Sequence, residues 1–364
     1  MTGPLANLKV VEFTHMVMGP AAGAILAALG AEVTRVEPKG GDPTRRLIGS
    51  GAGYFPMYNR HKSSLFLDLK SPGGVAEAKA LTADADIVIE NFRPGALDRL
   101  GLGYDALAAA NPRLIYCSLK GFLPGPYENR TALDEVAQMM GGLAYMTGPP
   151  GQPLRAGASV IDVSGGMFGV IAVLAAVEDR HRSGKGQKVS AALFETTVYL
   201  VGQHMAQMAV TGQAAAPMPA RISAWAIYDV FATKDEPVFI GVVSDKLWAD
   251  FCALFGLDDL WNDLSLRTNN DRVARRDQLL PRIRALVAGY TRQEIVAKLD
   301  GTGIPFAPIA RPEDLFADPH LVASGQLEKV VLPSGDATFL PRLPINFSDH
   351  DLQSGDAKLA AEPG

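Results

Sequence analysis

Short strand-like segments alternate with longer helical patterns along the first two hundred residues, and this alternation constrains the fold more than any other feature. Runs rich in β-branched residues predict strands at residues 8–13, 32–38, 64–69, 86–92, 113–119 and 187–193. Helical patterns predict helices between them, at residues 21–30, 73–83, 134–146 and 163–182. Because such alternation builds a parallel sheet with helices on both faces, the sequence predicts an α/β fold.

The length and the later part of the chain indicate a second domain. A chain of 364 residues is too long for one ordinary hydrophobic core. Residues 211–226 are rich in alanine, proline and glycine, which is typical of a linker. We therefore expect a large domain over 1–210, a smaller α+β domain over 227–325, and a C-terminal segment, 326–364, that returns to the large domain.

Composition argues against several classes of partner. The net charge of −5 provides no basic field for nucleic acid or for an anionic membrane. No signal peptide is evident, and the apolar run 165–177 is too short to span a bilayer, so we expect a buried helix there. Cys117 and Cys252 lie far apart among apolar residues, which indicates reduced thiols in a cytoplasmic protein. The six histidines lack zinc-binding spacing, so no metal site is expected.

A group of cations between residues 35 and 62 follows the predicted strand ends. Its members are Arg35, Lys39, Arg45, Arg46, Arg60 and Lys62. Singly, each is more typical of a solvated surface, but together they suit an anionic ligand such as a phosphate. The first strand–helix–strand unit resembles a dinucleotide fold, with Glu37 where a ribose-binding acid would lie. Its turn, THMVMGPAAGA, lacks the GxGxxG spacing, which disfavours a nicotinamide cofactor.

Asp162 is the candidate for chemistry, and two interpretations of it stay open. As a structural residue it would cap the helix predicted at 163–182. As a catalytic residue it would be a nucleophile toward an activated acyl group, held ionised by the helix dipole. On that interpretation Gly165 and Gly166 would leave room for a substrate. Neither a GxSxG serine nor a Cys–His signature competes with it.

Five blocks, in order, resemble the family III CoA-transferases. They are VVEFTHMVMGPAAGAILAALGAEVTRVEPKGGDPTR, NRHKSSLFLDLKSPGG, DIVIENFRPGALDRLGLGYDAL, NPRLIYCSLKGF and EDRHRSGKGQKVSAALFE. The resemblance implies a Rossmann-like large domain with a smaller inserted domain, and an interlocked homodimer. It implies an acyl-CoA and a carboxylic acid as substrates, with no tightly bound cofactor. It also implies that Asp162 forms an aspartyl anhydride and then an aspartyl-CoA thioester.

The same resemblance assigns binding residues. The positions expected to bind coenzyme A are His15, Val17, Lys39, Leu67, Asp68, Leu69, Lys70, Asn91, Phe92, Arg93 and Arg99. Arg45, Arg46 and Asp134 are expected to contact the substrate acid, and His15 and Arg221 are further candidates for that contact.

Two departures from the family narrow the expected activity. Formyl-CoA transferase has glutamine at the position of Val17, and valine cannot orient a formyl group by hydrogen bonding. Leu133 occupies the place of the histidine that α-methylacyl-CoA racemase uses as an acid/base, so a transferase is favoured over a racemase or isomerase.

The stretch RISAWAIYDVFATKDEPVFIGVVSDKLW resembles transferases of C4–C5 dicarboxylates. We therefore expect succinyl-CoA as the donor and itaconate, mesaconate, citramalate or malate as the acceptor. Intramolecular CoA transfer between C1 and C4 of mesaconyl-CoA is an alternative that would use the same residues.

Overall fold

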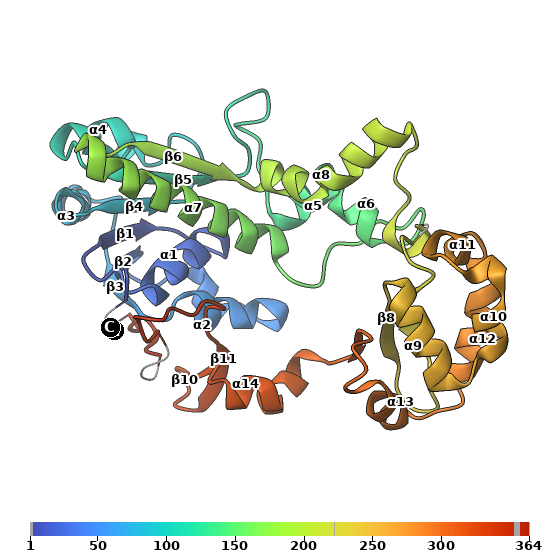
Figure 1. Ribbon diagram of the computed structural model, residues 1–364. Helices are drawn as coiled ribbons and strands as arrows, with labels where there is room; N and C mark the ends of the chain where they lie inside the picture. The colour runs from blue at the N-terminus through green and yellow to red at the C-terminus, as the bar shows by residue number, and fades with distance from the viewer. Residues whose placement is uncertain (1–2, 222, 353–356, 364) are drawn as a thin grey trace. The chain divides into compact units, whose positions relative to one another are not determined.

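The computed structural model describes residues 3–221, 223–352 and 357–363. Two compact units make up the chain (Figure 1). Unit 1 comprises Met1–Pro219 together with Pro319–Gly364, and unit 2 comprises Ala220–Asp318.

Unit 1 is built on a parallel sheet of six strands in the order β3-β2-β1-β4-β5-β6. The strands are β1 (Lys9–Phe13), β2 (Glu32–Glu37), β3 (Lys62–Phe66), β4 (Ile87–Glu90), β5 (Ile115–Lys120) and β6 (Lys188–Ala192). All six coincide with predicted strands, which confirms the α/β prediction. The chain starts in the middle of the sheet, winds out to β3, and then crosses to β4 on the other side of β1. In sheets of this kind ligands bind at the carboxyl ends of the strands flanking this switch, here β1 and β4.

Helices cover both faces of the sheet because successive strand residues point to opposite sides. On one face Ile87, Ile89 and Cys117 form a core with α1 (Met18–Ala28) and α7 (Val160–Ser183). On the other face Val88 and Tyr116 form a core with α3 (Pro72–Ala83) and α4 (Tyr104–Ala110). Helix α7 runs back along the sheet between β5 and β6, so its N-terminus lies toward the carboxyl edge (Figure 1).

The observed helices differ from the predicted ones in several places. The helix predicted at 134–146 is two helices, α5 (Asp134–Met140) and α6 (Leu143–Thr147), because Gly142 between them has a φ of 85°. Helix α8 (Leu193–Thr211) was not predicted, although it is 19 residues long. Helix α7 begins at Val160, three residues before its predicted start, and this places Asp162 inside its first turn.

The glycines of α7 serve close packing. A Cβ atom on Gly166 would lie 2.8 Å from the carbonyl oxygen of Met18, and one on Gly165 would lie 2.7 Å from the Met18 methyl carbon. The expectation that these glycines leave room for a substrate is therefore wrong, because α1 occupies the space. By length and composition α7 could cross a membrane, with a mean hydropathy of 2.1, but its most apolar stretch is already 44% buried within this chain.

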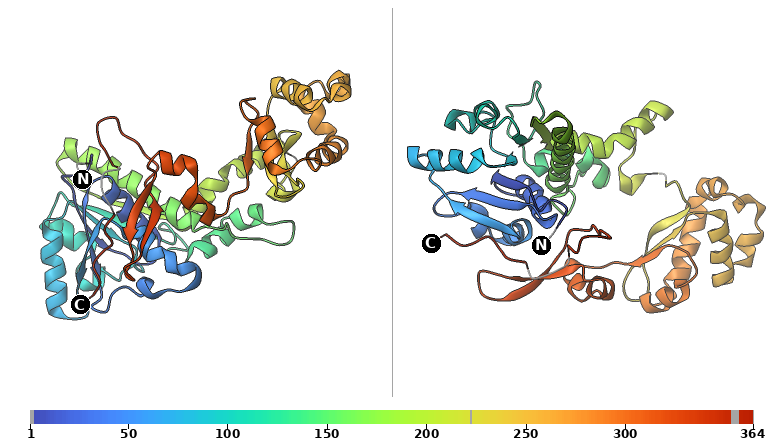
Figure 2. Two further views of the ribbon diagram at one scale, coloured as in Figure 1. Left: turned by 90° about the horizontal axis from the view of Figure 1, so that it is seen from below. Right: turned by 60° about the vertical axis from the view of Figure 1, so that its left-hand side comes forward.

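The C-terminal part of unit 1 lies against the loop that precedes β3. Helix α14 (Pro319–Ala323) leads into an antiparallel hairpin of β10 (Leu327–Val331) and β11 (Ala337–Pro341). Glu328 on β10 forms an ion pair with Arg60. Further along, Leu359 forms a β-bridge with Arg60, and the C-terminal residues run beside the N-terminal part of the unit (Figure 2).

The loop between β2 and β3 contains two 3₁₀ turns, Pro43–Arg46 and Gly49–Gly53, and the short helix α2 (Tyr54–Tyr58).

Unit 2 has a three-stranded antiparallel sheet of β7 (Ile227–Phe231), β8 (Val238–Val242) and β9 (Phe306–Pro308). Its helices are α9 (Asp245–Phe255), α10 (Asp258–Asn262), α11 (Asn269–Ala274), α12 (Arg276–Val287) and α13 (Arg292–Leu299). Trp248, Phe251 and Ile283 from these helices pack on the sheet residues Phe231 and Ile240 to form a separate core.

Candidate active site

The N-termini of α1 and α7 meet at the carboxyl edge of the sheet. His15 lies in the turn between β1 and α1, and Asp162 lies in the first turn of α7. Because Gly166 packs on the backbone of Met18, both the turn that carries His15 and the turn that carries Asp162 are held at the point where the two helices touch. The structure thus brings the first turns of α1 and α7, which lie far apart in the sequence, against one another.

Asn91 fixes the turn that carries His15. Its side-chain oxygen accepts a hydrogen bond from the His15 backbone N–H at 3.0 Å, and its amide nitrogen donates to the His15 carbonyl at 2.9 Å. The rings of His15 and Phe92 lie 5.4 Å apart. The next residue, Met16, has a φ of 61°, which residues other than glycine rarely adopt. The two hydrogen bonds from Asn91 to the His15 backbone help to maintain it. Asn91 therefore joins β4 to the turn after β1, across the switch in strand order.

The Asp162 side chain differs from the cap that the sequence suggested. Ser159, not Asp162, is the N-cap residue of α7, and its side chain makes no capping hydrogen bond. Among the described residues the Asp162 carboxylate has no hydrogen-bond or ion-pair partner. Burial, followed by the negative charges of Asp134 and Glu135, raises the pKa of Asp162 to about 7. The sequence suggested that the helix dipole keeps Asp162 ionised. The raised pKa shows that the dipole does not keep this carboxyl strongly acidic.

The residue that caps α7 is Asp134, at the start of α5. One of its carboxylate oxygens accepts hydrogen bonds from the backbone N–H groups of Ile161, at 2.9 Å, and Asp162, at 3.0 Å. These N–H groups lie in the first turn of α7, where a helix has no internal partner for them. Asp134 is only 4% exposed, so its carboxylate is used within the fold and is not accessible to a substrate acid, contrary to the expectation from the sequence.

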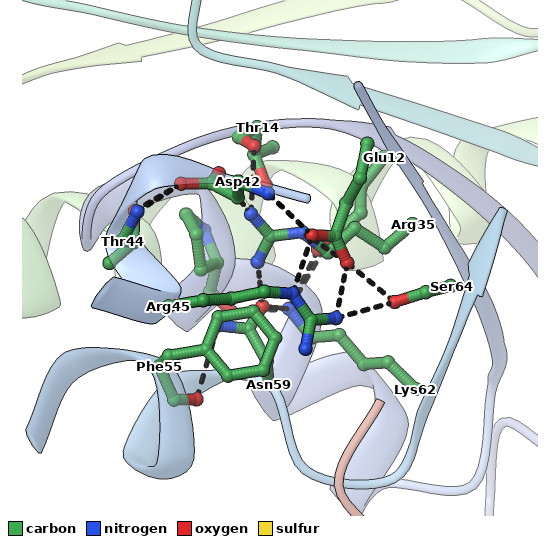
Figure 3. A network of polar contacts seen from close by, with 12 residues as sticks. Glu12, Thr14, Arg35, Asp42, Thr44, Arg45, Phe55, Asn59, Lys62 and Ser64 are labelled. Atoms are coloured by element: carbon green, nitrogen blue, oxygen red, sulfur yellow. Dashed lines mark hydrogen bonds and ion pairs between the residues drawn. The ribbon is translucent and has the colours of Figure 1, made fainter. Parts of the chain in front are cut away.

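Much of the predicted cationic cluster is occupied by internal carboxylates (Figure 3). Arg35 forms an ion pair with Asp42, and the Lys62 amine lies 2.8 Å from Glu12. Burial lowers the pKa of Lys62 to about 8. These buried pairs hold the loop between β2 and β3 against the sheet, and they do not face a ligand.

Arg45 is part of the same network. It lies 2.7 Å from the Glu37 carboxylate and 3.9 Å from the centre of the Phe55 ring, and its side chain is 4% exposed. Burial alone would raise the pKa of Glu37, but hydrogen bonds from Arg45 and Ser64 outweigh it and lower the pKa to about 2. Glu37 is thus not available to a ribose, and Arg45 is not available to a substrate. Lys39 and Arg46 stay exposed.

The other residues predicted to bind coenzyme A differ in how far their side chains are exposed. Val17 and Leu67 are buried, at 1% and 5% exposure, and can offer a ligand little beyond their backbone. Asp68, Leu69, Asn91 and Phe92 are partly buried; Lys70, Arg93 and Arg99 are exposed. Asp68 accepts a hydrogen bond from the Lys70 backbone N–H at 3.0 Å, which shapes the turn after β3. Arg221 belongs to unit 2.

A cavity of about 190 Å³ lies beside the segment that contains Phe92 and Arg93. Arg93, Lys120, Tyr104 and Tyr116 contribute to its walls, and it opens on the α4 face of the sheet, whereas α7 packs on the other face. The Lys120 amine bonds to Glu90 at 2.6 Å and to the Phe92 carbonyl. Sequence reasoning missed Lys120, although its position at the end of a predicted strand could have indicated it.

Comparisons with known proteins identify the family of the chain. Residues 5–358 match the model of CoA-transferase family III. The chain is 33% identical to a succinate–glutarate CoA-transferase of Agrobacterium fabrum, covering 96% of this chain and 91% of that protein. It is 32% identical to a succinyl-CoA–D-citramalate CoA-transferase of Chloroflexus aurantiacus, covering 99% and 89%. A CAIB/BAIF family protein from Brucella suis superposes with a TM-score of 0.84 at 35% identity, covering 100% and 96%.

The chain therefore belongs to CoA-transferase family III. It is an enzyme that transfers coenzyme A, and CoA thioesters are its substrates.

Proposed function

We propose that this enzyme moves coenzyme A between carboxylic acids with Asp162 as the nucleophile. The observation that carries the proposal is the Asp162 carboxylate itself. It is placed at the carboxyl edge of the sheet without a hydrogen-bond partner among the described residues, while the neighbouring Asp134 supplies the helix cap. A carboxylate that its own fold does not use is available to attack an activated acyl group.

The reaction has two covalent stages. An Asp162 oxygen attacks the thioester carbonyl, the carbon–sulfur bond breaks, and the CoA thiolate leaves behind a mixed anhydride. The thiolate then attacks the Asp162 carbonyl carbon, which releases the donor acid and leaves an aspartyl-CoA thioester. An acceptor carboxylate reverses the sequence and departs as the new acyl-CoA. Because anhydrides hydrolyse, water has to be kept from the site while they exist.

We propose succinyl-CoA as the donor and a C4–C5 dicarboxylate, such as itaconate, mesaconate, citramalate or malate, as the acceptor. Two relatives support this substrate class: one is a succinate–glutarate CoA-transferase and the other a succinyl-CoA–D-citramalate CoA-transferase. The side chains of Arg46 and His15 are exposed, and we propose that they contact the substrate acid. Their positive or hydrogen-bonding groups suit the second carboxylate of such an acid.

We further propose that the enzyme is a cytoplasmic homodimer. Apolar side chains face outward along α7 and α8, which favours cover by a second copy. They are Met167, Ile171, Tyr199, Leu200, Met205 and Met208. Measurement of the mass in solution by light scattering tests this part of the proposal, and a monomer at micromolar concentration would contradict it.

The central experiment combines turnover with chemical trapping. Succinyl-CoA is mixed with each acid of a panel and new CoA esters are read by mass spectrometry, with and without hydroxylamine. We expect hydroxylamine to inactivate the enzyme only during turnover and to leave a hydroxamate on Asp162. Asp162→Asn should abolish transfer, whereas Asp250→Asn, at a partly exposed position of unit 2, should not. Full activity of Asp162→Asn would overturn the proposal.

A further inference from the structure

We infer that Gln138 is a positioning residue for the nucleophile, because it fixes the orientation of the carboxylate that holds the first turn of α7. This inference rests on the proposed role of Asp162. Gln138 is completely buried, at 0% exposure, one turn after Asp134 on α5. Its hydrogen bonds among the described residues go to Asp134 and Ala156 and not to Asp162, so it acts through Asp134.

Both ends of the Gln138 amide are used. Its nitrogen donates a hydrogen bond to Oδ1 of Asp134, and its oxygen accepts one from the backbone N–H of Ala156 at 2.8 Å. With Oδ1 held in this way, Oδ2 of Asp134 is the oxygen that accepts from Ile161 and Asp162. The amide therefore fixes the cap and the segment that leads to it in one arrangement.

The segment before α7 depends on these contacts. Residues 152–158 form no helix or strand, and the N-cap residue Ser159 makes no side-chain capping bond. Arg155 also helps to hold this segment, through an ion pair with Glu135 and a hydrogen bond to the Ala158 carbonyl at 3.2 Å. Arg155 is partly exposed, so water can compete for its contacts. Gln138 and Asp134 are buried, so the hydrogen bonds between them and to the segment before α7 are shielded from water.

The identity of the amide follows from donor and acceptor counting. A glutamate side chain in place of Gln138 would still accept from Ala156 but would turn a second acceptor toward Oδ1 of Asp134. Methionine has a similar length but leaves the Ala156 N–H without a partner and leaves Oδ1 with only the partly exposed Arg155, 3.8 Å away. Only a side chain with one donor and one acceptor satisfies both groups, which is why glutamine stands at this buried position.

The inference predicts a specific rescue. In Gln138→Glu the two carboxylates repel, and the first turn of α7 loses its fixed cap. In the double variant Asp134→Asn with Gln138→Glu, the new asparagine amide donates to the introduced glutamate carboxylate, and the asparagine oxygen still accepts from the α7 backbone. The hydrogen bonds are then restored with the negative charge moved one helical turn away from Asp134.

The test measures kcat, the KM for succinyl-CoA and the rate of hydroxylamine trapping at Asp162. We expect Gln138→Glu and Gln138→Met to lower kcat and the trapping rate by about 10-fold or more, with KM within about twofold. The double variant should recover most of the loss seen in Gln138→Glu. Gln278→Met, at an exposed glutamine of α12, is the control for the substitution itself and should match the wild type.

Near-UV circular dichroism establishes which variants are folded. Folded single variants with wild-type kcat and trapping rate would overturn the inference, as would a folded double variant no better than Gln138→Glu. If the single variants do not fold, a double variant that folds but traps at less than about a tenth of the wild-type rate would overturn it. Wild-type enzyme that transfers CoA without labelling Asp162 would instead overturn the proposed function, so the two failures are distinguishable.

Discussion

The Asp134 carboxylate accepts a hydrogen bond from the backbone N–H of Asp162, at 3.0 Å, so one acidic side chain caps the helical turn that carries another. The cap satisfies N–H groups that would otherwise stabilise negative charge on Asp162. It also places its own negative charge beside Asp162. Both effects work against ionisation of Asp162, in the same direction as its burial.

Covalent capture of Asp162 should depend on pH near neutrality. Only the carboxylate form attacks a thioester, so the trapping rate should rise with pH and reach half of its maximum near the pKa of about 7. Asp134→Asn removes the nearer negative charge and should move this midpoint down by about one pH unit. Trapping with hydroxylamine across a pH series measures the midpoint. Glu135→Gln is the control and should move it less in the same direction; an upward shift in Asp134→Asn would contradict the electrostatic account.

Asp162 should also cost stability at neutral and alkaline pH. Its pKa rises from about 4 in the unfolded chain to about 7 in the folded protein, so between these values the folded state binds more protons. The contribution of Asp162 to stability is therefore lost as the pH rises through this window. Asp162→Asn should stabilise the protein by about 4 kcal/mol at pH 8 and by almost nothing at pH 4. Urea unfolding at both pH values measures this, and equal effects at the two would refute the linkage.

The buried pair of Lys62 and Glu12 should be sensitive to the loss of one member. Lys62→Met leaves the Glu12 charge buried without a partner and should destabilise the protein by about 3–5 kcal/mol. Replacing both residues by apolar ones should recover most of that loss. Lys9→Met breaks a comparable but exposed ion pair with Asp84 and should leave the free energy of unfolding almost unchanged. A loss as small for Lys62→Met would show that the buried pair does not hold the loop.

Asn91 should affect coenzyme A binding through His15. Asn91→Leu removes both hydrogen bonds to the His15 backbone and releases the turn at Met16. We expect an increase of about 10-fold in the Kd for coenzyme A, corresponding to roughly one net hydrogen bond. Asn91→Asp keeps the acceptor but loses the donor, and should have an intermediate effect. Titration calorimetry with free coenzyme A gives the Kd, and Asn262→Leu, at an exposed asparagine, is the control. An unchanged Kd in Asn91→Leu would show that the hydrogen bonds from Asn91 to His15 are not needed for coenzyme A binding.

The parallel sheet was predictable from the sequence because its strands are short runs of β-branched residues between helical patterns. Helix α8 was not, because LFETTVYLV at its start has the aromatic and β-branched residues of a strand, and tertiary packing overrides that preference. The β11 strand was also not predicted: ATFLP has only one β-branched residue, and it is ordered as a strand by pairing with β10.

The chemistry of the site was easier to predict than its supporting residues. Asp162 was singled out as the one carboxylate among small residues, but its place within the helix was wrong because helix starts are read poorly from composition. Gln138 gave no signal, since a glutamine in DEVAQMM looks like any helical position. Its importance comes from Ala156 and Asp134, which meet it only in the folded chain.

The return of the C-terminal segment to unit 1 has a consequence for biosynthesis. The His61 backbone N–H bonds to the Lys358 carbonyl at 2.8 Å, and Arg45 bonds to the Ala361 carbonyl at 2.8 Å, across 316 positions of sequence. The residues that make these contacts, Lys358 and Ala361, therefore leave the ribosome only after all of unit 2 has been translated. During synthesis the loop between β2 and β3 lacks its hydrogen bonds to the C-terminal segment. A chain that terminates early lacks these contacts permanently, although the rest of the large sheet of unit 1 has been made.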